Sequence, residues 1–352
     1  MGATGRNFGS DNVTPASPEI INAVLAANTG ALHSYGDDPH TGRLTELARV
    51  AFGTELAIFP VTTGTAANAL ALATLTPPFG AVYCHEAAHI MTDECGAPEF
   101  FTGGAKVIGL PTRDGKLLPR QLEQPLRFAA DMGVHHVRPA TLSLTQSTEW
   151  GTVYTPDEVR ALADAAHAQG LAVHMDGSRL ANAIVSLGCT PAEITWKAGV
   201  DALCLGATKN GAMAAEAVIF FDRSRADGFA SRRKRAGHLW SKTRFVSAQL
   251  VAYLEGDLWL RNARHANAMA ARLATGLTAL PGVRLVQPAQ ANEVFLEIPE
   301  GLIGALLADG FEFYRWPAPP GVNGSVVRLV TAYCTGAEDV DALIQAAGRF
   351  SD

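Results

Sequence analysis

The sequence predicts an α/β fold: a large domain around a mostly parallel central sheet, followed by a smaller α+β domain. Short apolar runs alternate with helical stretches through the first 245 residues, which is typical of parallel strands joined by crossover helices. With 352 residues, the chain also exceeds the usual size of a single core. Beyond residue 245 a long helical stretch precedes shorter strands, so we expect domains at 1–245 and 246–352.

The expected elements follow one another in a regular order. In the large domain, apolar spacing and helix-end residues predict helices at 15–28, 42–52, 119–131 and 156–168. Short apolar runs predict strands at 57–61, 81–84, 106–109, 141–145, 171–175, 201–205 and 217–221. In the small domain we expect a long helical region over 246–279, strands at 293–298, 311–315 and 326–331, and a last helix over 337–349.

Composition indicates a globular enzyme with a large core. Hydrophobic residues make up 48% of the chain, and the net charge of -6 argues against nucleic acid or an anionic membrane as a main partner. No apolar run is long enough for a membrane span, and the first residues lack the apolar core of a signal peptide. The odd, scattered cysteines predict reduced thiols in a cytoplasmic protein; they are Cys84, Cys95, Cys189, Cys204 and Cys334.

Two of the expected strands end in reactive side chains. Asp176 follows the strand at 171–175, and Thr208 and Lys209 follow the strand at 201–205 in a Gly-rich turn. This pair suits pyridoxal phosphate, because a Lys forms a Schiff base with its aldehyde and an Asp keeps its pyridine nitrogen protonated. Taken singly, each is more often a helix-start Asp or a surface Lys, but together they favour a pyridoxal phosphate site.

Thr63-Gly64-Thr65 lies between an expected strand and an Ala/Leu-rich helix. Backbone N–H groups at a helix N-terminus bind anions, and Gly lets a phosphate come close to the backbone. An ordinary cap by a Thr side chain explains the same residues. The turn therefore supports a phosphate site only in combination with Asp176 and Lys209.

The stretch His85-Glu86-Ala87-Ala88-His89 matches the H-E-x-x-H signature of zinc hydrolases. Zinc would need both His side chains on one helix, whereas this stretch directly follows an expected strand. We therefore expect no metal. In a pyridoxal phosphate site His89 would matter most, because a flat imidazole can stack on the cofactor ring.

Arginines supply candidate ligands for a substrate carboxylate. Arg179 follows the Asp176 strand, and Arg328 lies in an apolar run that needs a partner for its charge. A structural ion pair is the alternative for either residue. The basic segment with Lys234 and Arg244 is a solvated face, or it supplies cations to a phosphate across a subunit boundary.

These residues, in this order, resemble the low-specificity L-threonine aldolase family over nearly the whole chain. The matching stretches are Ser10-Asp11-Asn12-Val13-Thr14, Tyr35-Gly36-Asp37-Asp38-Pro39, Thr63-Gly64-Thr65-Ala66-Ala67-Asn68, Ala88-His89-Ile90, His174-Met175-Asp176-Gly177-Ser178-Arg179 and Val327-Arg328-Leu329-Val330-Thr331. Departures occur around Lys209, at Ser178 and at Gln146-Ser147-Thr148, where the family usually has E-N-T.

The resemblance implies a pyridoxal phosphate enzyme of fold type I that cleaves β-hydroxy-α-amino acids reversibly to glycine and an aldehyde. Cofactor ligands would be Thr63, Gly64, Thr65, His89, Asp176, Arg179, Thr208 and Lys209, with Lys234 and Arg244 reaching the phosphate of a neighbouring subunit. Ser10, Tyr35, Arg179 and Arg328 would contact the substrate. The base for the β-hydroxyl stays open between His89, one of His135 and His136, and a water.

The resemblance also implies dimer-based active sites, commonly in a tetramer. An aminotransferase or an amino-acid racemase is the alternative within pyridoxal phosphate chemistry, and a zinc hydrolase is the alternative outside it.

Overall fold

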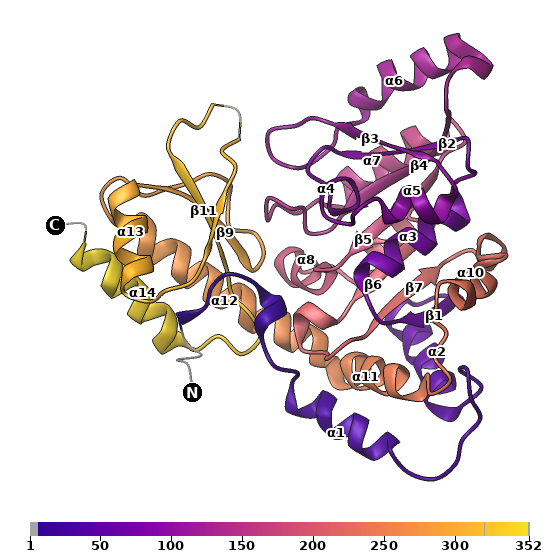
Figure 1. The fold of residues 1–352 in the computed structure, drawn as a ribbon, viewed down its shortest axis with the longest axis horizontal. Helices are drawn as coiled ribbons and strands as arrows, with labels where there is room; N and C mark the ends of the chain where they lie inside the picture. Colours follow the sequence, from indigo (N-terminus) through magenta and orange to yellow (C-terminus); the bar gives the residue numbers. More distant parts are fainter. Residues whose placement is uncertain (1–5, 320, 351–352) are drawn as a thin grey trace.

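Seven strands form the larger sheet of the computed structural model, which describes residues 6–319 and 321–350. In spatial order they are β1 (Ala57–Val61), β7 (Glu216–Phe220), β6 (Ala202–Gly206), β5 (Ala172–Gly177), β4 (Arg138–Thr145), β2 (Gly80–His85) and β3 (Lys106–Leu110). Only β7 runs antiparallel to its neighbours, and the remaining neighbouring pairs are parallel (Figure 1). The parallel strands therefore end at one common edge.

Helices cover both faces of this sheet. The helices up to the second sheet are α1 (Pro18–Ala27), α2 (Pro39–Phe52), α3 (Gly64–Leu75), α4 (His89–Thr92), α5 (Ala97–Thr102), α6 (Pro119–Met132), α7 (Pro156–His167), α8 (Leu180–Leu187), α9 (Pro191–Ile194), α10 (Phe229–Arg235) and α11 (Arg244–Leu254). Side chains alternate along β5: Val173 and Met175 join the core with α7, while His174 and Asp176 face the opposite way. Cys204 on β6 contacts His174 and packs against α3, so His174 and Asp176 face α3.

The second sheet is antiparallel and has four strands. Their order is β10 (Tyr314–Trp316), β11 (Ser325–Val330), β9 (Glu293–Ile298) and β8 (Arg284–Leu285), and the helices beside them are α12 (Leu258–Thr278), α13 (Glu300–Ala308) and α14 (Ala337–Arg349). This part has a hydrophobic core of its own. The N-terminal segment contributes to it, because Phe8 is buried there and Asn7 forms a bridge with Glu312.

The fold class predicted from the sequence is confirmed: a mostly parallel sheet covered by helices is followed by a small α+β part. The long helical region expected over 246–279 is interrupted, since Gly256 and Asp257 both have positive φ angles between α11 and α12. The strand expected at 311–315 is displaced to Tyr314–Trp316, because Glu312 pairs with Asn7 of the N-terminal segment and only the later residues pair with β11.

The boundary expected at residue 245 lies one residue after the start of α11. That helix packs against α1 and α2 in the larger part, whereas Phe8 packs with the smaller one. The division into 1–245 and 246–352 stays a prediction. Residues 1–5, which belong to the stretch without a signal-peptide core, lie outside the described residues.

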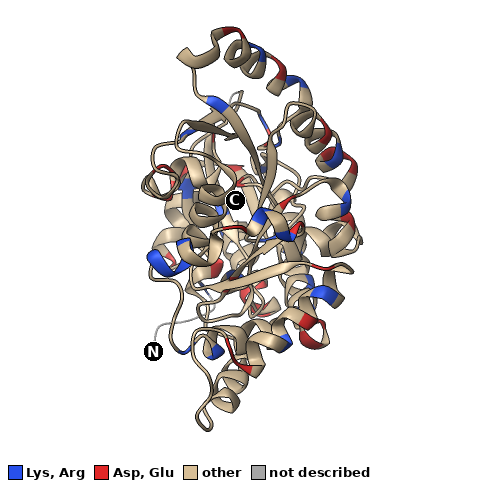
Figure 2. Cartoon of the chain, turned by 90° about the vertical axis from the view of Figure 1, so that its right-hand side faces the viewer, with Lys and Arg blue, Asp and Glu red and all other residues tan. Residues whose placement is uncertain are grey.

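Charged residues of both signs are interspersed over the surface. In Figure 2, blue and red segments alternate along the helices and no continuous basic face is visible in this view. Within residues 6–319 and 321–350, no helix is both long enough and apolar enough to cross a membrane. All five cysteines are free thiols, and Cys84 and Cys204 are buried.

Candidate active site

A cavity of about 560 Å³ lies beyond the carboxyl ends of β4 and β5. It is lined by the larger sheet, the N-terminal segment and the second sheet; the polar side chains include Ser10, His89, Glu149, Arg179, Lys209, Glu293 and Arg328. Parallel strands bring the residues that follow them to one edge, which is where α/β sheets bind ligands. In this sheet β5, which carries Asp176 near its end, and β6, which precedes Lys209, are paired neighbours.

Asp176 is a buried carboxylate at the end of β5. Its Oδ2 accepts a hydrogen bond from Asn68 Nδ2 at 2.8 Å, and its Oδ1 accepts one from the backbone N–H of Ser178 at 2.9 Å. Burial alone would raise the pKa of Asp176, but the positive charges of Lys209 and His89 outweigh it and lower the pKa. The side chain is therefore ionised at neutral pH, as a partner of a protonated ring nitrogen must be.

His89 begins α4 and its ring is fixed by an acidic partner. The Nδ1 atom lies 2.9 Å from Glu94 Oε1, and the same oxygen accepts a hydrogen bond from Asn68 Nδ2 at 2.8 Å. Asn68 therefore links the partner of His89 to Asp176. The hydrogen bond from Glu94 raises the pKa of His89.

Lys209 lies in the short 3₁₀ turn Thr208–Asn210 after β6 and points to the cavity. The buried Asn210 anchors this turn, since its Nδ2 donates to Tyr253 Oη at 2.9 Å and to Trp259 O at 2.8 Å. Gly206 ends β6, and a Cβ at this position would lie only 2.6 Å from Ser178 Cα. Glycine therefore allows the end of β6 to come close to the residues that follow β5. Among the described residues, the Lys209 amine has no hydrogen-bond or salt-bridge partner.

Thr63 caps the N-terminus of α3. Its Oγ1 accepts the backbone N–H of Ala66 at 3.2 Å, which is the ordinary capping role considered above. Asn68, the partner of Asp176, lies one turn further along the same helix. The N-terminus of α3 is therefore about 6 Å from Asn68 along the helix axis. Thr208 is turned toward the backbone of Ala215.

These residues fit pyridoxal phosphate. A free amine, an ionised buried carboxylate and an imidazole lie together, and the helix end one turn from Asn68 suits the phosphate. Lys209 would hold the aldehyde carbon, Asp176 the pyridine nitrogen, His89 the ring face and Thr63–Thr65 the phosphate.

Two arginines line the cavity, and they differ in how many of their N–H groups already have a partner. The guanidinium of Arg179 is buried and fully engaged: Nε and Nη2 donate to Asp11 at 2.9 and 3.0 Å, and Nη1 lies 3.1 Å from Glu293 Oε2. Arg328 stacks over Trp316 at 4.4 Å, donates from Nη2 to Gly9 O at 3.1 Å, and places Nη1 3.7 Å from Glu293 Oε1. Its Nε is buried and has no hydrogen-bond partner among the described residues. Arg328 is therefore the arginine with an N–H group left for a ligand.

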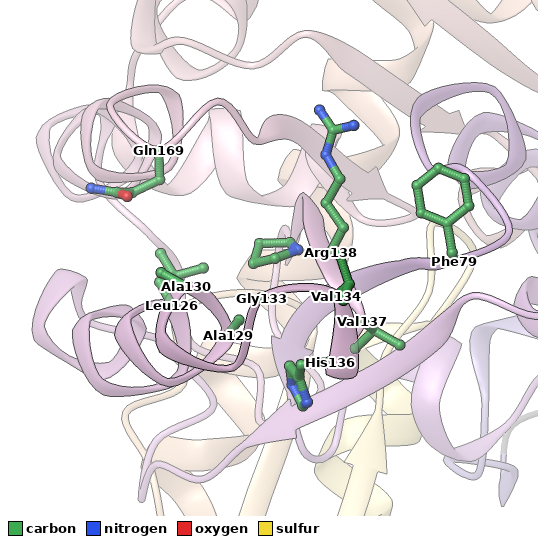
Figure 3. Close-up of a pocket in the computed structure, with 11 residues that line it drawn as sticks. Phe79, Leu126, Ala129, Ala130, Gly133, Val134, His136, Val137, Arg138 and Gln169 are labelled. Atoms are coloured by element: carbon green, nitrogen blue, oxygen red, sulfur yellow. The ribbon is translucent and has the colours of Figure 1, made fainter.

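His135 and His136 do not lie in this cavity. They precede Arg138, the first residue of β4, whereas the cavity is at the other end of that strand. Eight extended residues span about 26 Å. His136 instead lines a separate, largely apolar pocket with Leu126 and Phe79 (Figure 3). In this chain the structure does not bring either His to Lys209.

Tyr35, Lys234 and Arg244 also lie outside the Lys209 cavity. Tyr35 is half exposed with the Lys234 amine 4.4 Å above its ring, and its N–H donates to Ser241 O at 3.0 Å. Arg244 Nη1 donates to Gly30 O at 3.2 Å. Their expected roles at a cofactor or substrate stay predictions.

The H-E-x-x-H stretch does not have the geometry of a zinc hydrolase. His85 is the last residue of β2 and His89 the first residue of α4, so they are not one turn apart on a helix. His85 Nδ1 accepts the N–H of Ala87 at 3.1 Å, and Nε2 lies 3.3 Å from Thr112 O. Across residues 6–319 and 321–350, no group of three or more His, Cys, Asp or Glu side chains could hold a metal ion.

Comparisons with known proteins agree with the geometry. A family model described as beta-eliminating lyase matches residues 7–300. The low specificity L-threonine aldolase of Pseudomonas aeruginosa is 47% identical over 90% of this chain and 91% of that protein. The chain belongs to the low-specificity L-threonine aldolase family. The resemblance seen in the sequence is thereby confirmed.

Solved structures agree as well. Threonine aldolase from Leishmania major superposes with a TM-score of 0.91 at 28% identity, over 98% of this chain and 99% of that one. Serine palmitoyltransferase of Sphingomonas wittichii, at 15% identity and a TM-score of 0.71, covers 97% of this chain and 86% of its own, and shares the fold alone. Membership of the family also makes this chain a carbon–carbon lyase, as expected.

The roles of several site residues were missed in the sequence. Asn68, Glu94, Glu149 and Glu293 all contact predicted residues or line the cavity. Glu149 was the easiest to find, because it follows Gln146-Ser147-Thr148 beyond an expected strand at the same sheet edge as Asp176. Glu293 and Glu94 had no comparable local signal.

Proposed function

We propose that this protein cleaves L-threonine, allo-threonine and related β-hydroxy-α-amino acids, including phenylserine, reversibly to glycine and an aldehyde, with pyridoxal phosphate as its cofactor. The observation that carries the proposal is that Lys209, His89 and Arg328 line one cavity, with Asp176 close enough for the charges of Lys209 and His89 to lower its pKa. Family membership supplies the reaction class. These four residues supply the side-chain groups that the reaction needs.

Each group has a separate task. When bound, pyridoxal phosphate supplies an electron sink for the pair released as the Cα–Cβ bond breaks. Lys209 would hold the aldehyde carbon of the cofactor until a substrate amine replaces it. Asp176 holds a proton on the pyridine nitrogen, and Asn68 keeps that carboxylate in place. His89, fixed by Glu94, covers the ring and excludes water from that side.

Arg328 and Ser10 would hold the substrate carboxylate. The buried, unpaired Nε of Arg328 is a donor without an acceptor, and a carboxylate satisfies it. Ser10 lies on the N-terminal segment that Arg179 anchors through Asp11. In this arrangement Arg179 helps indirectly, by positioning that segment. Holding the carboxylate orients the Cα–Cβ bond for cleavage.

Assembly and location belong to the same proposal. We expect a homodimer-based enzyme, with Lys234 and Arg244 directed to the cofactor phosphate of a neighbouring subunit and Tyr35 to its substrate, and a tetramer of two such dimers. Support comes from the position of all three outside their own Lys209 cavity. We also expect a cytoplasmic enzyme that binds neither nucleic acid nor membranes, on the basis of five free thiols and a net charge of -6.

The test is a steady-state assay of glycine release from L-threonine, allo-threonine and phenylserine by protein loaded with pyridoxal phosphate. We expect glycine and the matching aldehyde in equal amounts. Borohydride reduction followed by peptide mapping should place the cofactor on Lys209. A keto acid or the opposite enantiomer as the main product would replace the aldolase by an aminotransferase or a racemase, and label on another Lys would remove Lys209 from its role.

A further inference from the structure

Glu149 places a carboxyl group in the cavity that holds Lys209, where none of the roles above uses it. The Oε1 atom accepts the backbone N–H of His89 at 2.8 Å, which fixes the side chain. The Oε2 atom is buried and, within the described part of the chain, has no hydrogen-bond partner. A buried oxygen without a partner favours a ligand that brings one, such as a hydroxyl group.

The surroundings of Glu149 suit a group that gains and loses a proton. Burial raises the pKa of Glu149 to about 7, and the negative charge of Asp176 on β5 adds to this effect. The N–H of His89 on α4 and the hydroxyl of Thr145 at the end of β4 act in the opposite direction. Cys84 on β2 faces the same carboxyl, with its own thiol pKa raised by burial, and Lys209 lines the cavity beside it. Proton transfer is most efficient when the pKa of the group lies near the working pH.

The other candidates for the base are less well suited. His135 and His136 lie at the far end of β4. His89 is held by Glu94 through Nδ1, and its ring is already assigned to the face of the cofactor. Asp176 is committed to Asn68 and Ser178. Glu293, the other buried carboxyl of the cavity, is held between Arg179 at 3.1 Å and Arg328 at 3.7 Å. Within the described residues, Glu149 is therefore the buried cavity carboxyl that has a free oxygen and no salt bridge.

We propose that Glu149 is the catalytic base that takes the proton of the substrate β-hydroxyl. This assignment rests on the proposed function. The O–H bond breaks and its proton passes to Glu149 Oε2. The pair from that bond becomes the second C–O bond of the aldehyde, the Cα–Cβ bond breaks, and its electron pair stays with Cα. Cα then takes up one proton to give glycine, so the proton count of the whole reaction is unchanged. In the reverse direction protonated Glu149 donates to the aldehyde oxygen.

Glu149→Gln tests this step with little disturbance. The amide oxygen can still accept the N–H of His89, while the group loses the ability to take up a proton. Holoenzyme should lose about 100-fold or more in kcat for L-threonine. Exchange of the Cα proton of glycine with deuterium oxide involves no β-hydroxyl, so its rate should stay within about threefold of wild type.

Infrared spectroscopy gives a readout that is independent of activity. Two buried carboxyls, Glu149 and Glu216, have a pKa raised to about 7, and only Glu149 lines the cavity. The holoenzyme should show protonated-carboxyl bands that disappear as pH rises through about 7. Glu149→Gln should remove the band of Glu149 and Glu216→Gln that of Glu216, while any band from Glu94 or Glu293, whose pKa values burial also raises, should stay in both variants.

The outcomes separate this assignment from the proposed function. Wild-type enzyme that releases no glycine from any of the three substrates would overturn both. Wild-type cleavage with Glu149→Gln within about threefold would overturn only the role of Glu149. Equal loss of cleavage and of glycine exchange would also overturn it, because Glu149 would then support the cofactor site as a whole.

Discussion

Asp176 owes its ionised state to its neighbours. Burial raises the pKa of Asp176, whereas the positive charges of Lys209 and His89 lower it. Asn68 Nδ2 donates to Asp176 Oδ2 and so fixes the position of the carboxylate. The same two cations would keep the carboxylate charged before cofactor arrives, so the site is ready to receive a protonated ring nitrogen.

Asp176→Asn should leave the fold intact and reduce kcat by about 100-fold or more, comparable to removing one preorganised electrostatic partner. The neutral amide can still accept from Asn68, but it cannot stabilise a proton on the pyridine nitrogen. Glycine release measures the loss, and circular dichroism and thermal unfolding check the fold. Near-native turnover would contradict the role given to Asp176.

The two His side chains of the HEAAH stretch should respond differently. His89→Ala should weaken cofactor binding or turnover with little effect on stability, because its ring lies in the cavity. His85→Ala should reduce stability by about 1–3 kcal/mol with little effect on turnover, because buried His85 satisfies backbone groups of Ala87 and Thr112. Absorbance titration with pyridoxal phosphate and denaturant unfolding separate the effects. Equal loss of activity in both variants, restored by zinc, would favour a hydrolase instead.

At the scale of elements, strand β5 carries two titratable groups on its α3 side. His174 lies between Ser143 Oγ at 2.9 Å and Cys204 Sγ at 3.2 Å. Burial lowers the pKa of His174 although Asp176 acts in the opposite direction. The ring is therefore neutral in the folded protein at neutral pH.

This gives a prediction for stability against pH. Below the ordinary His pKa of about 6.5, the unfolded chain binds a proton that folded His174 does not. The contribution of neutral His174 to the free energy of unfolding is therefore complete above about pH 6.5, and it is lost as the pH falls below that value. His174→Asn, which does not titrate, should show a smaller loss than wild type between pH 7 and 5. Urea unfolding measures the difference; parallel curves would contradict the prediction.

Elements with a local signal could be predicted from the sequence. The strand at 293–298 and the helix at 337–349 have the bounds expected from apolar spacing, and Asp176 and Lys209 were found because they follow apolar strands. Long-range contacts could not be predicted in this way. The pairing of Arg179 with Asp11 joins residues 168 positions apart, and no local pattern marks it. The break at Gly256 was missed because Gly is tolerated within many helices.

At the scale of the whole molecule, we expect a neighbouring subunit to supply cations to the cofactor phosphate. Lys234 lies against the exposed ring of Tyr35, Arg244 contacts the backbone of Gly30, and neither lines the Lys209 cavity of its own chain. A phosphate with about two negative charges gains strongly from such groups. The proposed dimer brings the two surfaces together.

Lys234→Ala or Arg244→Ala should therefore raise the dissociation constant of pyridoxal phosphate by about tenfold or more, as expected for one lost charge-assisted hydrogen bond. Lys106→Ala, at an exposed position on the edge strand β3, is the matched control and should change little. Equilibrium dialysis gives the constants. Sedimentation should show that dilution to monomer releases cofactor; an active, saturated monomer would contradict shared sites.

The N-terminal segment has a consequence for the order of folding. It contacts residues near the other end of the chain: Asn7 Nδ2 donates to Glu312, Arg328 donates to Gly9 O, and Asn292 Nδ2 donates to Asp11. These contacts span 305, 319 and 281 positions, so a ribosome must release nearly the whole chain before they form. The Asp176 and Lys209 strands can pair earlier during synthesis, while the carboxylate-binding side of the cavity closes only after translation nears its end.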